Sequence, residues 1–216
     1  SLLENSNVKM VDFAGANRGV SVKAEDKALI VGMAGSFAVN KNVIKPVSGT
    51  YIIGGTSAYN HIDLDTISQI KNSNIINAAA VSNYAHQEET LASVAAPLAI
   101  DVSKGTKGFS AALNLSVNKV DNDVHANMVD NQVRIIPVND EDVPAYTSVQ
   151  NTAYDNSSQG TGAANVDVSK GTVGLGINAV WAELNNDVKA KVQGGRYDGI
   201  SNFDNNAATK LTQINL

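Results

Sequence analysis

Apolar and polar residues alternate along several segments of the chain, with the period of two that is typical of a half-buried β-strand. In residues 109–117 the odd positions are mostly apolar, and the even positions carry Ser, Ala and Asn. The same phase recurs in residues 175–181 and 31–39. Because side chains of a strand point alternately to opposite faces, we expect the odd positions to face the interior. The interior predicted in this way contains Phe109, Leu113, Leu115, Val117, Leu175, Ile177 and Trp181.

The alternation resumes after an Asn-Asp pair in two of these segments. Asn122-Asp123 is followed by apolar even positions up to Met128, and Asn186-Asp187 by the same pattern up to Val192. Asn and Asp favour turns because their short side chains hydrogen-bond to the nearby backbone. We therefore predict that each unit is a strand, a corner and a second strand.

Helix signals are weak, because Gly, Asn, Val and Thr recur at short intervals. One short helix is predicted at residues 87–96, with two glutamates in its first turn and Pro97 after its end. Residues 139–144 and 156–161 are rich in Asp, Asn, Ser and Gly, which predicts two loops.

Internal repeats organise the whole chain. The hexapeptide Asp-Val-Ser-Lys-Gly-Thr begins at Asp101 and again, identically, at Asp167. Each copy is followed by a glycine, an alternating stretch and the tripeptide Asn-Asp-Val, which begins at Asn122 and at Asn186. We divide the single segment 1–216 into three repeat units, with approximate bounds 1–70, 71–138 and 139–216.

Two weaker similarities extend the repeat towards the N-terminus. Residues 32–41 resemble residues 108–119, which aligns Val39 with Val117 and Trp181. Residues 72–81 resemble residues 5–14, and this segment is expected to form another rung.

These patterns predict an all-β protein whose architecture is a parallel β-helix, or β-solenoid. A unit of short strands cannot bury an apolar face alone, but it can do so when each strand stacks on its counterpart in the next turn. Stacked Asn side chains at the corners could then hydrogen-bond along the stack. The alternative is an antiparallel sandwich or barrel, which the same alternation permits.

Composition narrows the possible partners. The 216 residues include 16 Lys and Arg against 21 Asp and Glu, and the resulting net charge of −5 argues against a nucleic-acid partner. The chain contains no cysteine, which excludes disulfides, thiolate nucleophiles and cysteine-based metal sites. No apolar run approaches the length of a membrane-spanning helix, and residues 1–5 do not resemble a signal peptide.

The search for catalytic and metal-binding groups gives few candidates. His61, His86 and His125 lack the spacing of metal ligands, and we expect each to be an isolated, solvated residue. Asp63 and Asp65 lie on one strand face, as in polysaccharide-cleaving β-helices, and residues 121–123 carry clustered oxygens that could hold calcium. Solvated turn residues explain both groups more simply. We therefore expect no metal, no cofactor and no enzymatic activity.

Two tyrosines are the candidate binding residues. Tyr146 and Tyr154 lie in the irregular region at residues 139–165, and binding residues are often found on loops. Trp181 is expected to fill the core, with an exposed sugar-binding aromatic as the alternative.

Residues 108–129 and 174–192 share glycine-rich alternating strands followed by Asn-Asp and a second strand, and residues 32–41 carry part of this pattern. The pattern resembles the repeat regions of large secreted leukotoxins and filamentous haemagglutinin-like adhesins of Gram-negative bacteria, the fusobacterial leukotoxin type in particular. The resemblance covers about half of the chain. It implies a segment of a right-handed β-helical shaft, exported by an autotransporter or a two-partner route.

The resemblance implies a segment of a larger parent chain that is secreted or displayed on the bacterial cell surface. We expect it to act as an elongated scaffold and to meet a host-cell receptor or glycan. Two alternatives are a carbohydrate-active β-helix enzyme and a purely structural spacer. Unpaired strand edges at the ends of a solenoid also predict self-association.

Overall fold

The computed structural model describes residues 1–10, 18–40, 50–101, 108–136, 147–169 and 173–216. Fifteen strands form four sheets, and no helix occurs among the described residues. Sheet A contains β1 (Leu2–Glu4), β5 (Thr50–Lys71), β9 (Gly108–Val129) and β13 (Val173–Gln193). Sheet B contains β2 (Asn7–Lys9), β6 (Asn74–Ile76), β10 (Gln132–Arg134) and β14 (Arg196–Asp198). Sheet C contains β3 (Gly19–Ala34), β7 (Ala80–Ala95), β11 (Ser148–Ala163) and β15 (Asn202–Asn215). Sheet D contains β4 (Phe37–Asn40), β8 (Leu98–Asp101) and β12 (Val166–Ser169).

Every strand pairing in the described part of the chain is parallel and joins equivalent strands of successive rungs. The chain passes along sheet A, turns through sheet B, returns along sheet C and reaches sheet D. It then begins the next rung. The prediction of an all-β parallel β-solenoid with about three rungs is confirmed, and the antiparallel alternative is wrong.

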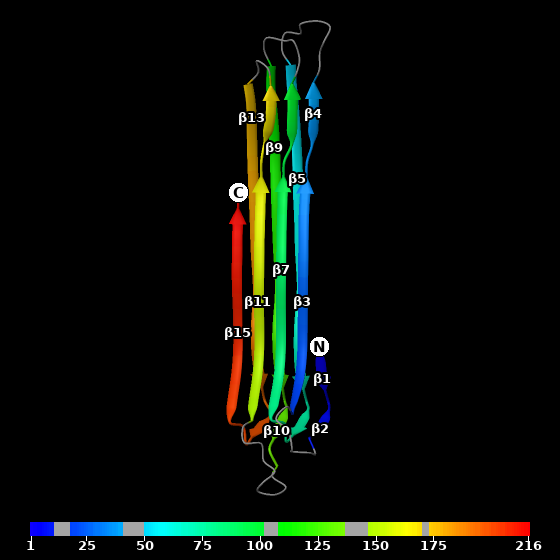
Figure 1. Cartoon of the computed structure of the whole chain (residues 1–216), viewed down its shortest axis with the longest axis vertical. Helices are drawn as coiled ribbons and strands as arrows, with labels where there is room; N and C mark the ends of the chain where they lie inside the picture. Colours follow the sequence, from blue (N-terminus) through cyan, green and yellow to red (C-terminus); the bar gives the residue numbers. More distant parts are fainter. Residues whose placement is uncertain (11–17, 41–49, 102–107, 137–146, 170–172) are drawn as a thin grey trace.

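The rungs are long and flat (Figure 1). The 22 residues of β9 extend over about 70 Å at the usual rise of a strand. Sheets A and C run side by side along the longest dimension of the molecule and face each other (Figure 1). Sheet B forms the arc at one end.

The arc is built from residues with left-handed backbone conformations. Asn5, Asn72, Asp130 and Gly194 occupy equivalent positions after the sheet A strands, with φ angles of 50°, 48°, 52° and 63°. Few residue types tolerate this conformation, and Asn, Asp and Gly are the usual ones. Many of the asparagines therefore mark true turns, although not those at the predicted corners.

The Asn-Asp pairs do not form corners. Asn122 and Asp123 lie inside β9, and Asn186 and Asp187 lie inside β13, so each predicted strand-corner-strand unit is one continuous strand. Because the strand continues without a break, the side chains keep one alternation throughout its length. Even positions of β9 face the interior, including the apolar residues Val120, Val124, Ala126 and Met128.

As a result, the side chains predicted to face the interior in the half of sheet A remote from the arc face outward instead. Ser110, Ala112, Asn114, Ser116 and Asn118 are buried. The predicted core residues lie on the outer face instead, where Leu113 and Ile177 are half exposed and Trp181 is 62% exposed. Leu115 and Leu175 are exposed as well, and Phe109 and Val117 are only partly buried. A shift by one residue exchanges the two faces of a strand, and the alternation alone could not tell which face was inside.

Ladders of asparagine hold the polar part of the interior together. Asn83 donates to Asn151 over 2.7 Å, and Asn151 donates to Asn205 over 2.8 Å, so one ladder crosses three rungs of sheet C. In sheet A, Asn114 donates to Asn178 over 2.8 Å, and Asn60 to Asn118 over 3.1 Å. The predicted hydrogen bonding of stacked Asn along the solenoid is therefore present, but inside the strands.

An apolar core lies beside the arc. Its fully buried members come from sheets A, B and C: Ile70, Ile75, Val81, Met128, Val133 and Val149. This cluster fills the interior beside the arc, where each rung turns from sheet A into sheet C.

Two local predictions are wrong. All but the last residue of the predicted helix at residues 87–96 belong to β7, in which Gln87, Glu89 and Leu91 alternate inward. The predicted loop at residues 156–161 is part of β11. In both cases pairing with strands of the adjacent rungs overrides the local preference. The other predicted loop, at residues 139–144, lies outside the described residues.

The repeats agree with the register only in part. Asn122 hydrogen-bonds to Asn186, 64 residues later, which is the register of β9 and β13 throughout. Asn74 likewise bonds to Asn7, 67 residues earlier, so the expected extra rung is confirmed. The predicted alignment of residues 32–41 with residues 108–119 is wrong. Val39 lies in sheet D, and the residue paired with Val117 is Tyr59.

Candidate functional site

Charged columns cover the outer face of sheet A near its middle. Asp63, Asp121 and Asn185 follow one another across three rungs, and two residues along the strands Asp65, Asp123 and Asp187 form a second column. Neighbouring parallel strands lie about 4.8 Å apart, so like charges within a column are close. A cavity of about 540 Å³ borders both columns.

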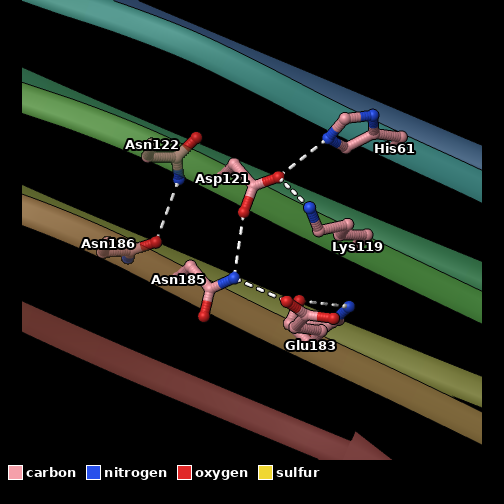
Figure 2. Close-up of polar contacts among 8 residues, drawn as sticks. His61, Lys119, Asp121, Asn122, Glu183, Asn185 and Asn186 are labelled. Carbon is pink, nitrogen blue, oxygen red and sulfur yellow. Dashed lines mark hydrogen bonds and ion pairs between the residues drawn. The ribbon is translucent and has the colours of Figure 1, made fainter.

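Asp121 is the best connected of these carboxylates (Figure 2). Lys119 Nζ lies 2.6 Å and His61 Nε2 3.0 Å from its Oδ2, and Asn185 Nδ2 donates to its Oδ1 over 3.0 Å. The hydrogen bond from Lys119 and those from Asn185 and His61 lower the pKa of Asp121 to about 2. Asp121 is therefore a carboxylate at neutral pH.

This protonation state bears on the enzyme alternative. A glycosidase needs one carboxyl group that holds a proton for the leaving group and a second that is ionised. Asp121 cannot supply that proton near neutral pH, and its charge is already balanced by Lys119. The column that contains Asp121 is therefore better suited to holding a polar or charged group by electrostatic attraction than to acting as a general acid.

A further cluster joins Asp123, His125 and Asp187, whose potential ligand atoms all lie within 4.8 Å of one another. His125 Nε2 makes no hydrogen bond and lies 3.5 Å from Asp187 Oδ2. Lys189 binds the same carboxylate and lowers the pKa of Asp187, with a smaller contribution from His125. Lys189 thus competes with any cation at this position.

Sequence reasoning missed this cluster because its members come from two rungs. The repeated Asn-Asp-Val tripeptide was the signal that could have revealed it, since stacking the two copies brings Asp123 next to Asp187. The prediction that the histidines are isolated is wrong, although His61 is solvated as expected, with 37% of its side chain exposed. His61 contacts Asp121, His86 contacts Glu25 at 3.8 Å, and all three histidines lie beside carboxylates.

An aromatic cluster lies on the outer face of sheet C. The ring of His86 lies 5.8 Å from that of Tyr84 and 5.3 Å from that of Tyr154, measured between centroids. Lys23 Nζ lies 5.5 Å from the centre of the Tyr84 ring, and Lys23 also pairs with Glu25 over 2.7 Å. We call these five residues the aromatic cluster.

The aromatic cluster contains one of the two predicted binding residues. Tyr154 lies in β11 rather than in a loop, and its rung neighbour is His86. Tyr146 lies outside the described residues. The lysine beside Glu25 lowers the pKa of that carboxyl, with a smaller contribution from His86, so the cluster presents aromatic rings beside a paired positive and negative charge.

A second outer surface is apolar. Towards the end of sheet A that is remote from the arc, large apolar residues on three adjacent strands are exposed: Ile53, Tyr59, Leu113, Leu115, Leu175, Ile177 and Trp181. A hollow of about 390 Å³ lies among them over Gly55 and Ser57. Contiguous exposed apolar residues of this kind commonly mark an interaction surface.

Comparison of the chain with protein-family models, with curated proteins and with solved structures finds no match. Among the described residues, no helix is long and apolar enough to cross a membrane.

Proposed function

We propose that the chain is a segment of an exported bacterial virulence protein, of the leukotoxin or adhesin type, and that it serves as an elongated scaffold carrying a host-cell interaction surface. The parent protein would be secreted or displayed on the cell surface. The main support is the aromatic cluster, whose rings of Tyr84, His86 and Tyr154 lie on the outer face of paired strands. The repeat resemblance provides the biological setting.

A host glycan is the ligand class that this cluster fits best. Aromatic rings supply apolar faces for the C–H surface of a sugar, and Lys23, Glu25 and His86 supply hydrogen-bonding groups around them. Because the rings belong to paired strands, little conformational entropy is lost when a ligand binds. The three rings are partly buried, and the surface that they leave accessible suits a chain end or an extended glycan.

The test is binding of the labelled, folded chain to leukocytes and epithelial cells, with and without enzymatic removal of cell-surface glycans. We expect saturable binding that deglycosylation abolishes and that the double variant Tyr84→Ala/Tyr154→Ala weakens by about tenfold or more. Tyr59→Ala removes an exposed tyrosine from sheet A and is the matched control. Absence of saturable binding, or equal losses in both variants, would contradict the proposal and favour the spacer alternative.

Release of reducing sugars separates the enzyme alternative from binding. A scaffold releases none from the glycans that it binds. Release that Asp121→Asn or Asp63→Asn abolished would instead establish a carbohydrate-active enzyme.

A further inference from the structure

The outer face of sheet A becomes apolar towards the end of the solenoid that is remote from the arc. Ile53, Tyr59 and Trp181 are 74%, 65% and 62% exposed there. Four further exposed side chains fill the surface between them: Leu113, Leu115, Leu175 and Ile177. We call these seven residues the apolar patch. Together they expose about 800 Å², which is more than the largest apolar surface of a typical monomer.

No charged residue interrupts the strands of sheet A over this length. Residues 50–60 of β5, 108–118 of β9 and 173–182 of β13 contain no Asp, Glu, Lys or Arg. The charges begin in the next outward row, which contains Lys119 and Glu183. At the usual rise of a strand, the uncharged length of β9 is about 35 Å.

The opposite face of the solenoid is apolar near the same end. On the outer face of sheet C, Leu29 and Met33 of β3 are 71% and 83% exposed, and Val94 of β7 is 44% exposed. Residues 28–34 and 90–95 carry no charge. Further rungs of a solenoid stack on the edges of its sheets, so they leave both of these faces open.

The interior between the two apolar faces is polar. Ser116 contacts Ser93 over 2.7 Å, and Asn118 donates to Thr161 over 2.7 Å, with all four residues buried. The backbone of β9 is paired on both sides, with β5 and β13, so the outer face of this strand presents side chains only. Apolar side chains facing outward and polar side chains facing inward are the pattern of strands that lie in lipid.

Aromatic residues lie at the border of the apolar patch. Tyr59 and Trp181 are both in register with Val117, so they lie in one row. His61 and Lys119 belong to the adjacent row on the side of the arc. Tyr and Trp are enriched at the boundary between hydrocarbon and lipid headgroups, because each has an apolar ring and a polar atom.

We propose that the end of the solenoid remote from the arc enters a lipid bilayer, with the apolar patch in the hydrocarbon and the row of Tyr59 and Trp181 at the headgroups. The uncharged length of about 35 Å matches a hydrocarbon thickness of roughly 30 Å. In sheet D, at the remote end (Figure 1), Asp101 and Asp167 then lie near the opposite headgroups.

Lipid fits these observations better than a protein partner. A second copy of the chain, or another protein with a flat surface, covers one face, whereas lipid surrounds the end and covers the outer faces of sheets A and C together. The aspartate columns of sheet A lie on the arc side of Tyr59 and Trp181 and stay in water, as the cost of burying charge in hydrocarbon requires.

Binding to vesicles tests the proposal, and Trp181 reports it directly because it is the only tryptophan. Phosphatidylcholine vesicles have no net charge and no glycan. As lipid is added, we expect Trp181 emission to shift to shorter wavelength and its quenching by acrylamide to fall. Half of the chain should be bound at about 0.1 mM lipid, as for a single acyl chain. Unchanged emission at about a hundred times this lipid concentration would overturn the proposal.

A charge within the apolar patch tests where the lipid binds. Leu113→Arg places a charge at hydrocarbon depth and should weaken vesicle binding about a hundredfold. Leu113 is 48% exposed, so this variant should keep the urea midpoint of the wild-type chain. Asn127→Arg adds the same charge to the same strand near the arc and is the matched control, which should bind as the wild type does. Equal vesicle binding of the two variants would overturn the proposal.

Brominated lipids test the depth of insertion. Leu113 lies about 13 Å further along the strands than Trp181, which is in register with Val117. Bromine close to the headgroups should quench Trp181 most. Bromine deep in the acyl chains should quench the variant Trp181→Phe/Leu113→Trp most. Equal depths of the two tryptophans would show that sheet A lies flat on the membrane surface, and would overturn insertion.

Self-association gives a different result in the same assay. Emission that shifts to shorter wavelength as the protein concentration rises, with no vesicles present, would show that a second copy covers the apolar patch. That result would overturn the proposal.

The proposal does not rest on the glycan site. Tyr84 and Tyr154 lie on sheet C nearer the arc, so Tyr84→Ala/Tyr154→Ala should bind vesicles as the wild type does. Lipid is far more dilute in a cell suspension than in the vesicle assay, so removal of glycans still abolishes binding to cells. Cell binding and vesicle binding can thus fail separately.

Discussion

Asn151→Ala is expected to destabilise the fold strongly, although it replaces a polar residue with an apolar one. Asn151 is fully buried in the middle rung of the longest asparagine ladder. It accepts from Asn83 over 2.7 Å and donates to Asn205 over 2.8 Å. Its amide also lies 3.0 Å from the backbone oxygen of Ala126 and 3.2 Å from that of Lys191, both in sheet A. The substitution removes all four contacts.

The magnitude follows from these contacts. A buried hydrogen bond contributes about 1 kcal/mol net, and a partner left without a bond costs more than that. Four lost contacts in a site that water cannot enter therefore correspond to a loss of about 3–5 kcal/mol in the free energy of unfolding. Asn205→Ala shortens the same ladder at its exposed end, where water replaces the lost bonds, and should cost less than about 1 kcal/mol.

Urea unfolding followed by far-UV circular dichroism measures both variants. The midpoint should fall sharply for Asn151→Ala and little for Asn205→Ala, with the same dependence on urea as the wild-type chain. Similar small losses in both variants would refute the reasoning, because they would show that Asn151 is accessible to water in the native state.

Two further predictions concern packing and pH. Gly32→Ala should lower the free energy of unfolding by about 1 kcal/mol, because its Cβ would lie 2.5 Å from Asn60 Oδ1 and would displace the side chain that donates to Asn118. A Cβ on Gly160 has nothing within 4 Å, so Gly160→Ala should be neutral in urea unfolding, and equal effects of the two variants would contradict this. The pKa of Asp121 is lowered to about 2 in the folded chain, so its carboxylate stabilises the fold fully above about pH 4. This contribution to the free energy of unfolding is lost as the pH falls towards 2. Asp121→Asn should reduce that acid-dependent loss by less than about 1 kcal/mol, given the exposure of the pair, and an unchanged pH profile would contradict the assignment.

The sequence predicted the parallel stack because stacking leaves a direct trace in it. Asn122-Asp123-Val124 and Asn186-Asp187-Val188 recur at the spacing of their register, and such recurrence is expected only where equivalent residues are neighbours. Alternation likewise predicted strands at residues 109–117 and 175–181.

The sequence could not reveal which face of these strands is inside. Ser110, Asn114 and Ser116 look like surface residues when one strand is considered alone. In-register stacking stabilises them inside, because the Asn114 Nδ2 donates to Asn178 on the next rung over 2.8 Å and the Ser116 hydroxyl contacts that of Ser93 on the opposite sheet over 2.7 Å. These hydrogen bonds form only when the rungs are stacked, so one strand considered alone does not reveal them.

The candidate site was predicted only in part for a similar reason. Tyr154 was identified, but as a loop residue, because its flanking sequence is polar. Its neighbour His86 lies on another rung, and no repeated motif links the two positions. The irregular spacing between rungs of sheet C, 68 residues from Asn83 to Asn151 and 54 from Asn151 to Asn205, hides such neighbours from a search for repeats.

The fluorescence of the single tryptophan tests the central claim most directly. That claim is that, in the half of sheet A remote from the arc, polar side chains face the interior and apolar side chains face outward. Trp181 is the only tryptophan in the chain and lies outward on β13. The native protein should show red-shifted emission that acrylamide quenches readily, with little change in wavelength when the chain unfolds in urea. Blue-shifted native emission that is protected from acrylamide and moves to the red on unfolding would place Trp181 in the core, and would contradict the account.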